Sequence, residues 1–204
     1  MSSWEERFKA DHYIYGTEAN AFLKEMQPLL KSDGNALALA EGEGRNAVFL
    51  AQQGMKVTAW DYAASGLTKT ERLAQEKGVE VKTEKVDLND AVWEKGKWDA
   101  ITCIFGHFPE KLRRKTLAGV KDAVKPGGFL VAEVYSPYQL SYGTGGPKDE
   151  QFLYKPEEFL QVFHDWRIVH FFMGEAERHE GDLHNGLSHV IQFAGQKNNS
   201  LMNR

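Results

Sequence analysis

The chain has 204 residues, of which 42% are hydrophobic and 26% are charged, and its formal net charge is −4. These values are typical of one globular domain and exclude a disordered or fibrous chain as a global description. Proteins that bind nucleic acid usually carry a basic surface, so the weak negative charge argues against that class. We therefore expect a single domain over residues 1–204, without a nucleic-acid partner.

Three features concern the cellular location. Cys103 is the only cysteine in the sequence, so the chain cannot form an internal disulfide, which suits a reducing compartment. Residues 1–7 contain no apolar run of the kind found in a signal peptide. No stretch approaches the roughly 18 apolar residues of a membrane span. We expect a cytoplasmic protein that does not bind a membrane.

The first quarter of the chain predicts a helix, a buried strand and a second helix. Apolar residues recur at helical spacing over 19–30, and we expect residues 1–34 to form an N-terminal helical cap. The apolar run 36–40 ends in a glycine-rich loop, which indicates a buried strand. A helical pattern follows and ends at Gly54, which suits a C-terminal glycine cap.

The same alternation continues through the middle of the chain. We expect strands at 56–60, 79–86, 98–105 and 129–135, and helices at 67–77 and 109–124. Strands that alternate with helices of this length imply right-handed crossovers and a parallel sheet.

The last third has a different character. Residues 137–154 are rich in Gly, Pro and Tyr, and so long a structureless connection predicts a lid. After a short helix that begins near Pro156, two strands at 167–173 and 188–194 have no helical pattern between them. We expect these strands to pair with each other and to leave an antiparallel strand at the edge of the sheet. The polar residues 196–204 are expected to fray.

The strongest local motif is Gly42-Glu43-Gly44-Arg45-Asn46-Ala47, between the first buried strand and its helix. Glycines at this point let the backbone approach a ligand, and the helix N-terminus offers free N–H groups and a positive dipole. The spacing fits G-x-G-x-x-A, the dinucleotide-binding fingerprint. It also fits the glycine loop of methyltransferases that use S-adenosylmethionine, so the motif leaves both cofactors open.

Acidic residues end the next two strands. Asp61 lies 17 residues after Gly44, where a carboxylate can accept hydrogen bonds from both hydroxyls of an adenosine ribose in either cofactor class. Asp87 is well placed to accept from an adenine amino group. The chain is also too short to add a separate substrate domain to a dinucleotide-binding one. These points favour a methyltransferase, with an NAD(P)-dependent oxidoreductase as the alternative.

Further motifs extend the comparison along the chain. They are Tyr15-Gly16-Thr17-Glu18-Ala19-Asn20, Phe105-Gly106-His107-Phe108, Lys125-Pro126-Gly127-Gly128 and Tyr142-Gly143-Thr144-Gly145-Gly146-Pro147. With the glycine loop, they make the chain resemble the class I S-adenosylmethionine-dependent methyltransferases over nearly its whole length. Among these it resembles the small bacterial group that includes the tellurite-resistance, TehB-type enzymes.

The resemblance implies a fold, a cofactor and a set of contacts. The fold would be α/β, a doubly wound Rossmann-like sheet of seven strands, mostly parallel with an antiparallel C-terminal strand. S-Adenosylmethionine would lie across the carboxyl ends of the first strands, with Tyr15 closing over it. The other contact residues would be Ala40, Glu41, Gly42, Gly44, Asp61, Tyr62, Asp87, Leu88 and Phe105. The protein would then be a methyltransferase with a small-molecule acceptor, as a monomer or homodimer.

The glycine loop departs from the family pattern. The family usually has an acidic residue followed by Leu, Gly and Cys, where this chain has Ala38, Leu39, Ala40 and Glu41. Loss of the acidic residue would weaken cofactor binding unless Glu41 takes over the contact with the cofactor's ammonium group. Ala40, in place of the family's glycine, would leave the cofactor less room to approach the backbone of the loop. A non-catalytic protein that binds S-adenosylmethionine is therefore a further alternative.

Two histidines are candidate catalytic residues. His107 follows the fourth strand, where class I enzymes place residues beside the transferred methyl group, and it could take a proton or only line the pocket. His184 lies in a stretch that resembles one in TehB-type enzymes, where a histidine and a following arginine serve the acceptor. Asn185 stands in the place of that arginine, which argues against tellurite or selenite. The acidic and histidine residues of 177–184 lack the H-E-x-x-H spacing, so we expect no metal.

Overall fold

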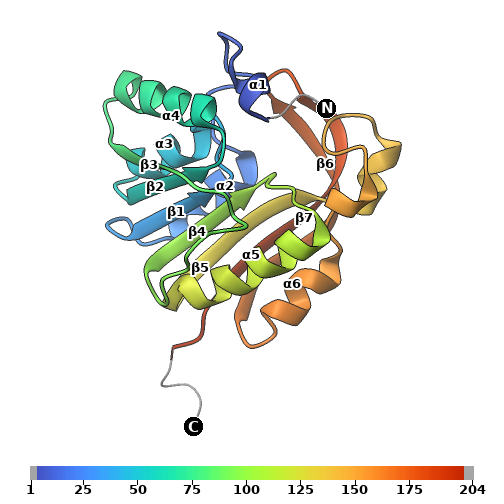
Figure 1. Cartoon of the computed structure of the whole chain (residues 1–204). Coiled ribbons are helices and arrows are strands. Elements are labelled where there is room, and N and C mark those ends of the chain that lie inside the picture. The colour runs from blue at the N-terminus through green and yellow to red at the C-terminus, as the bar shows by residue number, and fades with distance from the viewer. Residues whose placement is uncertain (1–3, 200–204) are drawn as a thin grey trace.

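The computed structural model describes residues 4–199, which fold around one seven-stranded sheet with the order β3-β2-β1-β4-β5-β7-β6 (Figure 1). The strands are β1 (Asn35–Leu39), β2 (Lys56–Asp61), β3 (Val81–Lys85), β4 (Trp98–Ile104), β5 (Val124–Tyr135), β6 (Arg167–Glu180) and β7 (His184–Gln196). The helices are α1 (Trp4–Phe8), α2 (Ala21–Met26), α3 (Arg45–Gln52), α4 (Ala64–Glu76), α5 (Glu110–Ala123) and α6 (Pro156–Val162). Short 3-10 turns are η1 (Gln27–Leu29), η2 (Pro137–Ser141) and η3 (Glu150–Phe152).

The central strand β1 shows how the sequence builds the layers. All of its residues after Asn35 are buried, because β2 and β4 flank it in parallel and helices cover both faces of the sheet (Figure 1). Ala36 and Ala38 pack in the cluster that includes α2 and α3, whereas Leu37 and Leu39 pack in the cluster that includes α5 and α6. The small side chains on one face of β1 and the large ones on the other thus set how closely each helix layer packs against the sheet.

The predicted fold class is confirmed, but the place of the antiparallel strand was wrong. β7 is antiparallel to its neighbours and lies between β5 and β6, so the edge strand β6 runs parallel to β5. The physical reason is burial. Val190, Ile191, Phe193 and Ala194 of β7 are almost inaccessible to solvent, whereas four of the large apolar residues of β6 are more than a third exposed, so the strand with the more buried residues takes the inner place.

Some element boundaries differ from those expected. The polar stretch between the last two strands is no long loop, because β6 continues to Glu180 and β7 begins at His184. Pro28 divides the first expected helix, so that α2 ends at Met26 and a 3-10 turn follows. The short helix α1 lies within the helical cap expected over residues 1–34, but its bounds could not be predicted, since five residues are too few to show a periodic pattern.

The segment predicted to be a lid is partly ordered. It contains η2 and η3, and Gln139 is buried, with its Nε2 donating to the Thr144 hydroxyl and the Gly145 carbonyl. The start of the expected frayed tail is held in place, because Lys197 Nζ donates to the carbonyls of Lys121 and Val124 at 2.6 and 2.8 Å. The rest of that tail, from residue 200, lies outside the described residues.

No helix within residues 4–199 is both long and apolar enough to cross a membrane.

Candidate functional site

The candidate site lies at the carboxyl ends of β1, β2 and β4, where the backbone takes uncommon conformations. Ala40, directly after β1, and Phe105, directly after β4, have φ angles of 49° and 55°. These are the two residues other than glycine with positive φ in the part of the chain that the structure describes. Such conformations are costly and cluster at functional sites, so the surrounding fold must hold these two turns in place.

The glycine loop requires glycine for a packing reason. At Gly44, with φ of 94°, an added Cβ would lie 2.7 Å from both the Cα and the hydroxyl oxygen of Thr70. The Thr70 hydroxyl donates to the Gly42 carbonyl at 3.2 Å, which fixes α4 against the loop. The G-x-G spacing therefore lets the loop and α4 approach each other closely at the start of α3.

Asp61 is the last residue of β2 and holds the glycine loop in place. Its Oδ2 accepts from the Gly42 N–H at 2.9 Å, and its Oδ1 accepts from the Ala63 N–H at 2.8 Å. Burial nevertheless raises the pKa of this carboxyl above its ordinary value. Within residues 4–199 it forms no ion pair, so the site contains a buried acid without a cationic partner.

Glu41 is the second acid of the site. Its Oε1 accepts from the N–H groups of Asn46 and Ala47 at 2.9 and 2.8 Å, which caps the first turn of α3. Burial raises the pKa of Glu41 to about 7, and the neighbouring charge of Asp61 adds to the shift. Glu41, which stands where the family pattern has cysteine, thus stabilises the N-terminus of α3. A contact from Glu41 to the cofactor remains a prediction.

The other residues expected near the adenine lie at the ends of β2 and β3. Asp87 is exposed, accepts from the N–H and the side-chain amide of Asn89, and has a lowered pKa because of these bonds. Leu88 is buried beside it. Tyr62 is 45% exposed, and its hydroxyl accepts from the Trp4 N–H at 3.2 Å.

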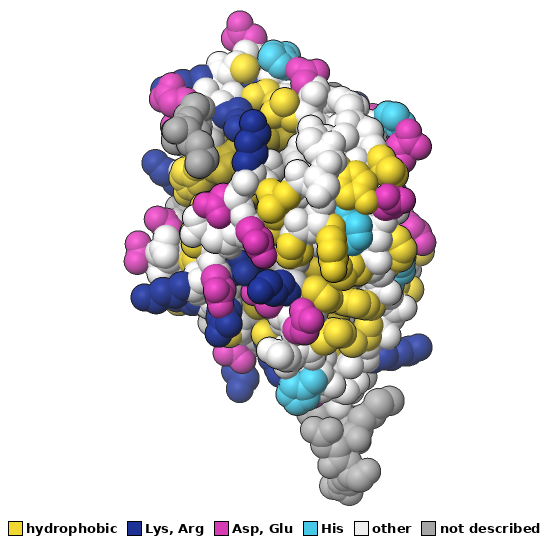
Figure 2. Space-filling model, turned by 90° about the vertical axis from the view of Figure 1, so that its right-hand side faces the viewer, with side chains coloured by type: hydrophobic (Ala, Val, Ile, Leu, Met, Phe, Trp, Pro, Cys, Tyr) yellow, Lys and Arg dark blue, Asp and Glu magenta, His cyan; other side chains and the backbone are white. Residues whose placement is uncertain are grey.

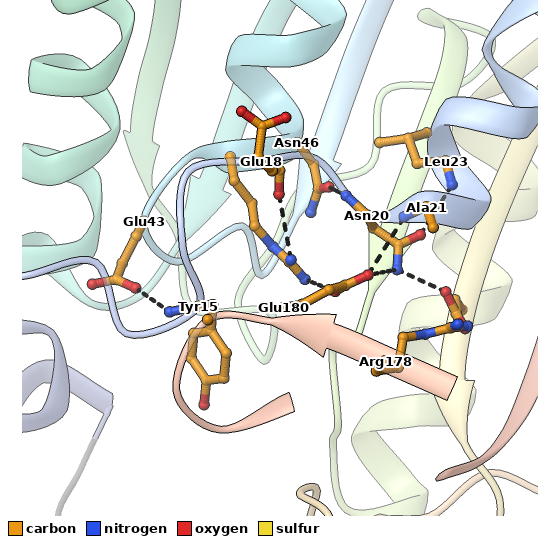
Figure 3. Close-up of polar contacts among 12 residues, drawn as sticks. Tyr15, Glu18, Asn20, Ala21, Leu23, Glu43, Asn46, Arg178 and Glu180 are labelled. Atoms are coloured by element: carbon orange, nitrogen blue, oxygen red, sulfur yellow. Dashed lines mark hydrogen bonds and ion pairs between the residues drawn. The ribbon is translucent and has the colours of Figure 1, made fainter. Parts of the chain in front are cut away.

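The N-terminal segment packs directly over the glycine loop, a relationship that the sequence did not reveal. The ring of Phe8 lies 2.9 Å from where a Cβ on Gly42 would be, and Phe8 is buried. The ring of Tyr15 contacts that of Phe8, and the Tyr15 hydroxyl accepts from Arg7 Nη1 at 3.1 Å. The backbone N–H of Tyr15 donates to Glu43 (Figure 3). Glu43 is itself buried and forms an ion pair with Lys69.

His184 lies in an aromatic cluster beside this loop. Its ring centroid is 4.5 Å from that of Phe105, 4.7 Å from that of Tyr15 and 5.6 Å from that of Tyr135. Burial and the nearby positive charge of Arg45 lower the pKa of His184 to about 3, so the ring is neutral. Its Nδ1 is buried and has no hydrogen-bond partner among the described residues, which is unusual for a buried polar atom.

His107 has both of its ring nitrogens in use. Its Nδ1 lies 3.0 Å from the Phe152 carbonyl oxygen, and its Nε2 accepts from the Tyr135 N–H at 3.4 Å. Burial lowers its pKa to about 4, so it is also neutral. It would have to give up one of these bonds before it took a proton, and its catalytic role remains a prediction.

A buried charged network beside the cluster was also missed (Figure 3). Asn20 Nδ2 donates to Glu133 at 2.7 Å and to Glu180 at 3.1 Å, while Arg178 pairs with Glu133 and Arg45 pairs with Glu180 at 2.6 Å. This network fastens the N-terminal segment to β5, β6 and α3. The one sequence signal was Glu133, a single acid within the apolar strand 129–135.

The topology separates the two cofactor classes left open by the glycine motif. Dinucleotide-binding folds have the parallel order 3-2-1-4-5-6, whereas here the antiparallel β7 is inserted between β5 and β6. Residues 36–128 match the family described as "Methyltransferase domain". This part of the chain is therefore similar to a methyltransferase domain.

Individual relatives agree with this assignment. The glycine/sarcosine N-methyltransferase of Halorhodospira halochloris is 32% identical over 140 residues, which cover 65% of this chain and 48% of the relative. The probable S-adenosyl-L-methionine-dependent methyltransferase TehB of Haemophilus influenzae is 22% identical over 160 residues, or 78% of this chain and 54% of the relative. The chain thus spans about half the length of the curated relatives that it matches.

The TehB methyltransferase is also similar to this chain in its solved structure. TehB from Haemophilus influenzae superposes with a TM-score of 0.74 at 17% identity, covering 89% of this chain and 63% of that chain. The predicted resemblance to TehB-type methyltransferases is therefore confirmed, and S-adenosylmethionine is the cofactor that this family uses.

Proposed function

We propose that this protein transfers a methyl group from S-adenosylmethionine to a small-molecule acceptor by in-line displacement. The observation that carries the proposal is the pair of acids at the carboxyl ends of β1 and β2, half-buried Glu41 and buried Asp61, each with a raised pKa. A cationic ligand at this point would stabilise their ionised forms. S-Adenosylmethionine is such a ligand, since it carries a sulfonium and an ammonium group.

The residues present fit this cofactor. Each oxygen of Asp61 keeps a lone pair beyond the bond that it accepts from Gly42 or Ala63, and these lone pairs can receive the ribose hydroxyls. Tyr62, Asp87 and Leu88 are the candidates for the adenine. The remaining candidate contacts are the backbone of Ala40, Gly42 and Gly44, with Glu41, Phe105 and Tyr15.

When bound, the cofactor supplies an electrophilic methyl carbon, so the protein needs chiefly to orient the acceptor and exclude water. Tyr15, Phe105 and Tyr135 form apolar walls of the kind that line small-molecule sites. The free Nδ1 of His184 would accept a hydrogen bond or a proton from the acceptor. The name of the Halorhodospira relative supports a small acceptor, such as an amine.

We also propose that residues 137–154 close over the acceptor. A Cβ added to Gly145 of this segment would lie 3.2 Å from Cδ2 of His184, so the segment already reaches the aromatic cluster. Protection of these residues from proteases should rise when cofactor and acceptor bind together. Unchanged cleavage would contradict a closing motion.

Calorimetry with S-adenosylmethionine, S-adenosylhomocysteine and NADH tests the cofactor assignment. We expect heat from the first two ligands, and heat from NADH alone would contradict the proposal. Replacement of Asp61 by Ala should weaken binding by about 1–3 kcal/mol, because charged hydrogen bonds are lost. Exposed Asp165→Ala is a matched control that should leave binding unchanged.

Turnover distinguishes an enzyme from a non-catalytic binding protein. S-Adenosylhomocysteine release should be measured across thiols, phenols, amines and oxyanions. Release that depends on one acceptor class supports the proposal. Tight cofactor binding without turnover on any class would favour the binding protein.

A further inference from the structure

Two buried tyrosines, Tyr135 and Tyr154, differ in the bonding of their hydroxyl groups. The Tyr154 hydroxyl donates to the Gly106 carbonyl at 2.8 Å. The hydroxyl of Tyr135, the last residue of β5, is buried and has no hydrogen-bond partner among the described residues. Ser188 is close to it but outside hydrogen-bonding geometry, and its own Oγ lies 3.0 Å from Oγ1 of Thr144. A buried polar group without a partner costs stability, which a role in binding a ligand would explain.

The unpaired hydroxyl lies close to the ring of His184. A Cβ on Gly145 would be 3.3 Å from the Tyr135 hydroxyl and 3.2 Å from Cδ2 of His184, so the two side chains meet beneath this glycine. Their ring centroids are 5.6 Å apart, and the Phe105 ring lies within 4.7 Å of both. Phe105 directly follows β4, so the pair lies at the carboxyl ends of β4 and β5. Both polar groups are thus within reach of one small molecule.

The two groups have complementary hydrogen-bonding roles. Burial raises the pKa of Tyr135, so its hydroxyl stays protonated and can donate. His184 is neutral, and with its proton on Nε2 the unpaired Nδ1 is an acceptor. The pair therefore offers one donor and one acceptor, both on uncharged side chains.

The surface around the pair suits an organic molecule. Leu140 of the segment 137–154 is exposed, as are Leu183 and Leu187 of the hairpin formed by β6 and β7. Figure 2 faces the side on which β6 and this segment lie in Figure 1, and it shows hydrophobic side chains gathered there at the surface. Apolar surroundings with a few polar groups that fix orientation are typical of sites for small organic ligands.

We propose that Tyr135 determines acceptor specificity, and that the acceptor is an organic molecule with two polar atoms a few bonds apart. This inference rests on the proposed methyl transfer. The atom to be methylated donates its hydrogen to Nδ1 of His184, and the second atom, an oxygen or nitrogen with a lone pair, accepts from the Tyr135 hydroxyl. On transfer, the first atom gains the methyl carbon and loses its proton to solvent, while the electron pair of the broken carbon–sulfur bond stays on sulfur.

Urea denaturation tests whether the Tyr135 hydroxyl is structural. Tyr135→Phe removes an unpaired polar atom, so the urea midpoint should stay unchanged or rise. Tyr154→Phe is the matched control, because it removes a hydroxyl that is bonded to Gly106, and its midpoint should fall. If the midpoint of Tyr135→Phe falls as far as that of Tyr154→Phe, the Tyr135 hydroxyl has a structural bond and the proposal is overturned.

Acceptors that differ by one hydroxyl test the specificity, with release of S-adenosylhomocysteine as the measurement. The pairs are 2-mercaptoethanol with 1-propanethiol, ethanolamine with propylamine, and catechol with 2-methylphenol. In the class that it methylates, wild type should prefer the molecule with the additional hydroxyl by about fivefold in kcat/KM, as expected for one hydrogen bond between uncharged groups. Tyr135→Phe should lose this preference, and its affinity for S-adenosylmethionine should stay within a factor of about two.

The outcomes separate this inference from the proposed function. If wild type methylates both members of a pair equally, if Tyr135→Phe keeps the preference, or if only inorganic oxyanions are methylated, the inference is overturned and methyl transfer itself stands. If S-adenosylmethionine binds but no acceptor of any class is methylated, the proposed function fails and this inference fails with it.

Discussion

Arg45, the first residue of α3, forms an ion pair with Glu180, the last residue of β6, at a distance of 2.6 Å. Both side chains are buried, so the pair joins the glycine loop to the hairpin that carries His184. Replacement of Glu180 by Ala would leave the buried guanidinium of Arg45 without its partner. We expect unfolding free energy to fall by about 3 kcal/mol, measured by urea denaturation.

The exposed pair between Arg114 and Glu110 on α5 is the matched control. Its two side chains are mostly accessible to solvent, so Glu110→Ala should change stability by less than about 1 kcal/mol. Equal effects of the two substitutions would show that burial of the Arg45–Glu180 pair does not matter.

Ala40 is strained by its position at the end of β1. Its φ of 49° is readily adopted by glycine, whereas an alanine side chain opposes it. Ala40→Gly should therefore stabilise the protein, by up to about 1 kcal/mol after the greater freedom of glycine in the unfolded chain is subtracted. Thermal denaturation measures the change.

The control for this substitution lies two residues earlier, within β1. Ala38 is fully buried and its φ is not positive, so Ala38→Gly should destabilise. If both glycine variants destabilise the protein, the strain at Ala40 is not significant.

The part of the fold that could be predicted rests on local patterns. The run 36–40 and the glycines after it predict a buried strand, a close turn and a helix, because each step depends on neighbouring residues. Asp61 was identified for the same reason, as the polar residue that ends an apolar strand. Neither the local pattern nor the resemblance placed β7 between β5 and β6.

The part of the site that the sequence did not predict depends on contacts between residues that are far apart in the sequence. Asn20 and Glu133 are 113 residues apart, and nothing in either local pattern pairs them. Phe8 lies in a helix too short to be periodic, yet it covers Gly42 because the whole N-terminal segment is fastened across the sheet. Such relationships depend on topology, which a single sequence expresses only weakly.

The raised pKa of Glu41 predicts a specific pH dependence. A carboxyl whose pKa rises from 4.5 to about 7 on folding stabilises the protein below pH 4.5 and loses that contribution as pH rises towards 7. Glu41→Gln stays neutral, so its stability relative to wild type should increase between pH 4.5 and 7. Denaturant unfolding across this range measures the difference.

Bound cofactor should change this result in a defined way. A cationic ligand favours ionised Glu41, so wild-type affinity for S-adenosylmethionine should rise over the same pH range, and that of Glu41→Gln should rise less. Identical pH profiles for the two proteins would show that Glu41 only caps α3.

We expect His184 to bind the acceptor through its unpaired Nδ1, as a neutral ring and not as a charged one. Its pKa is about 3, so turnover should show no histidine-dependent change from pH 5 to 8. His184→Phe keeps an aromatic ring against Tyr15 and Phe105 but removes Nδ1, and kcat should fall at least about tenfold. Cofactor affinity should stay within a factor of about two. His179→Phe, at an exposed residue of the same hairpin, should have wild-type kcat.

The N-terminal segment should respond to the cofactor because it lies over the glycine loop. Phe8 contacts Gly42, and Glu5 accepts from the Ser65 N–H at 3.2 Å and, through its carbonyl, from the Ser65 hydroxyl at 2.8 Å, so α1 lies against both the glycine loop and α4. Trypsin cleavage after Arg7 and Lys9 should slow when S-adenosylmethionine binds beneath α1. Phe8→Ala removes the main apolar contact, so it should speed this cleavage and the release of cofactor.

Cleavage within α5 provides the reference for this measurement. Arg114 lies on the opposite side of the sheet from α2 and α3, and its cleavage rate should not depend on cofactor or on Phe8. If cofactor slows cleavage after Arg7 and Arg114 equally, the effect is global stabilisation by the ligand. Selective protection of the N-terminal sites would show that α1 closes over the cofactor, which is what its position on Gly42 predicts.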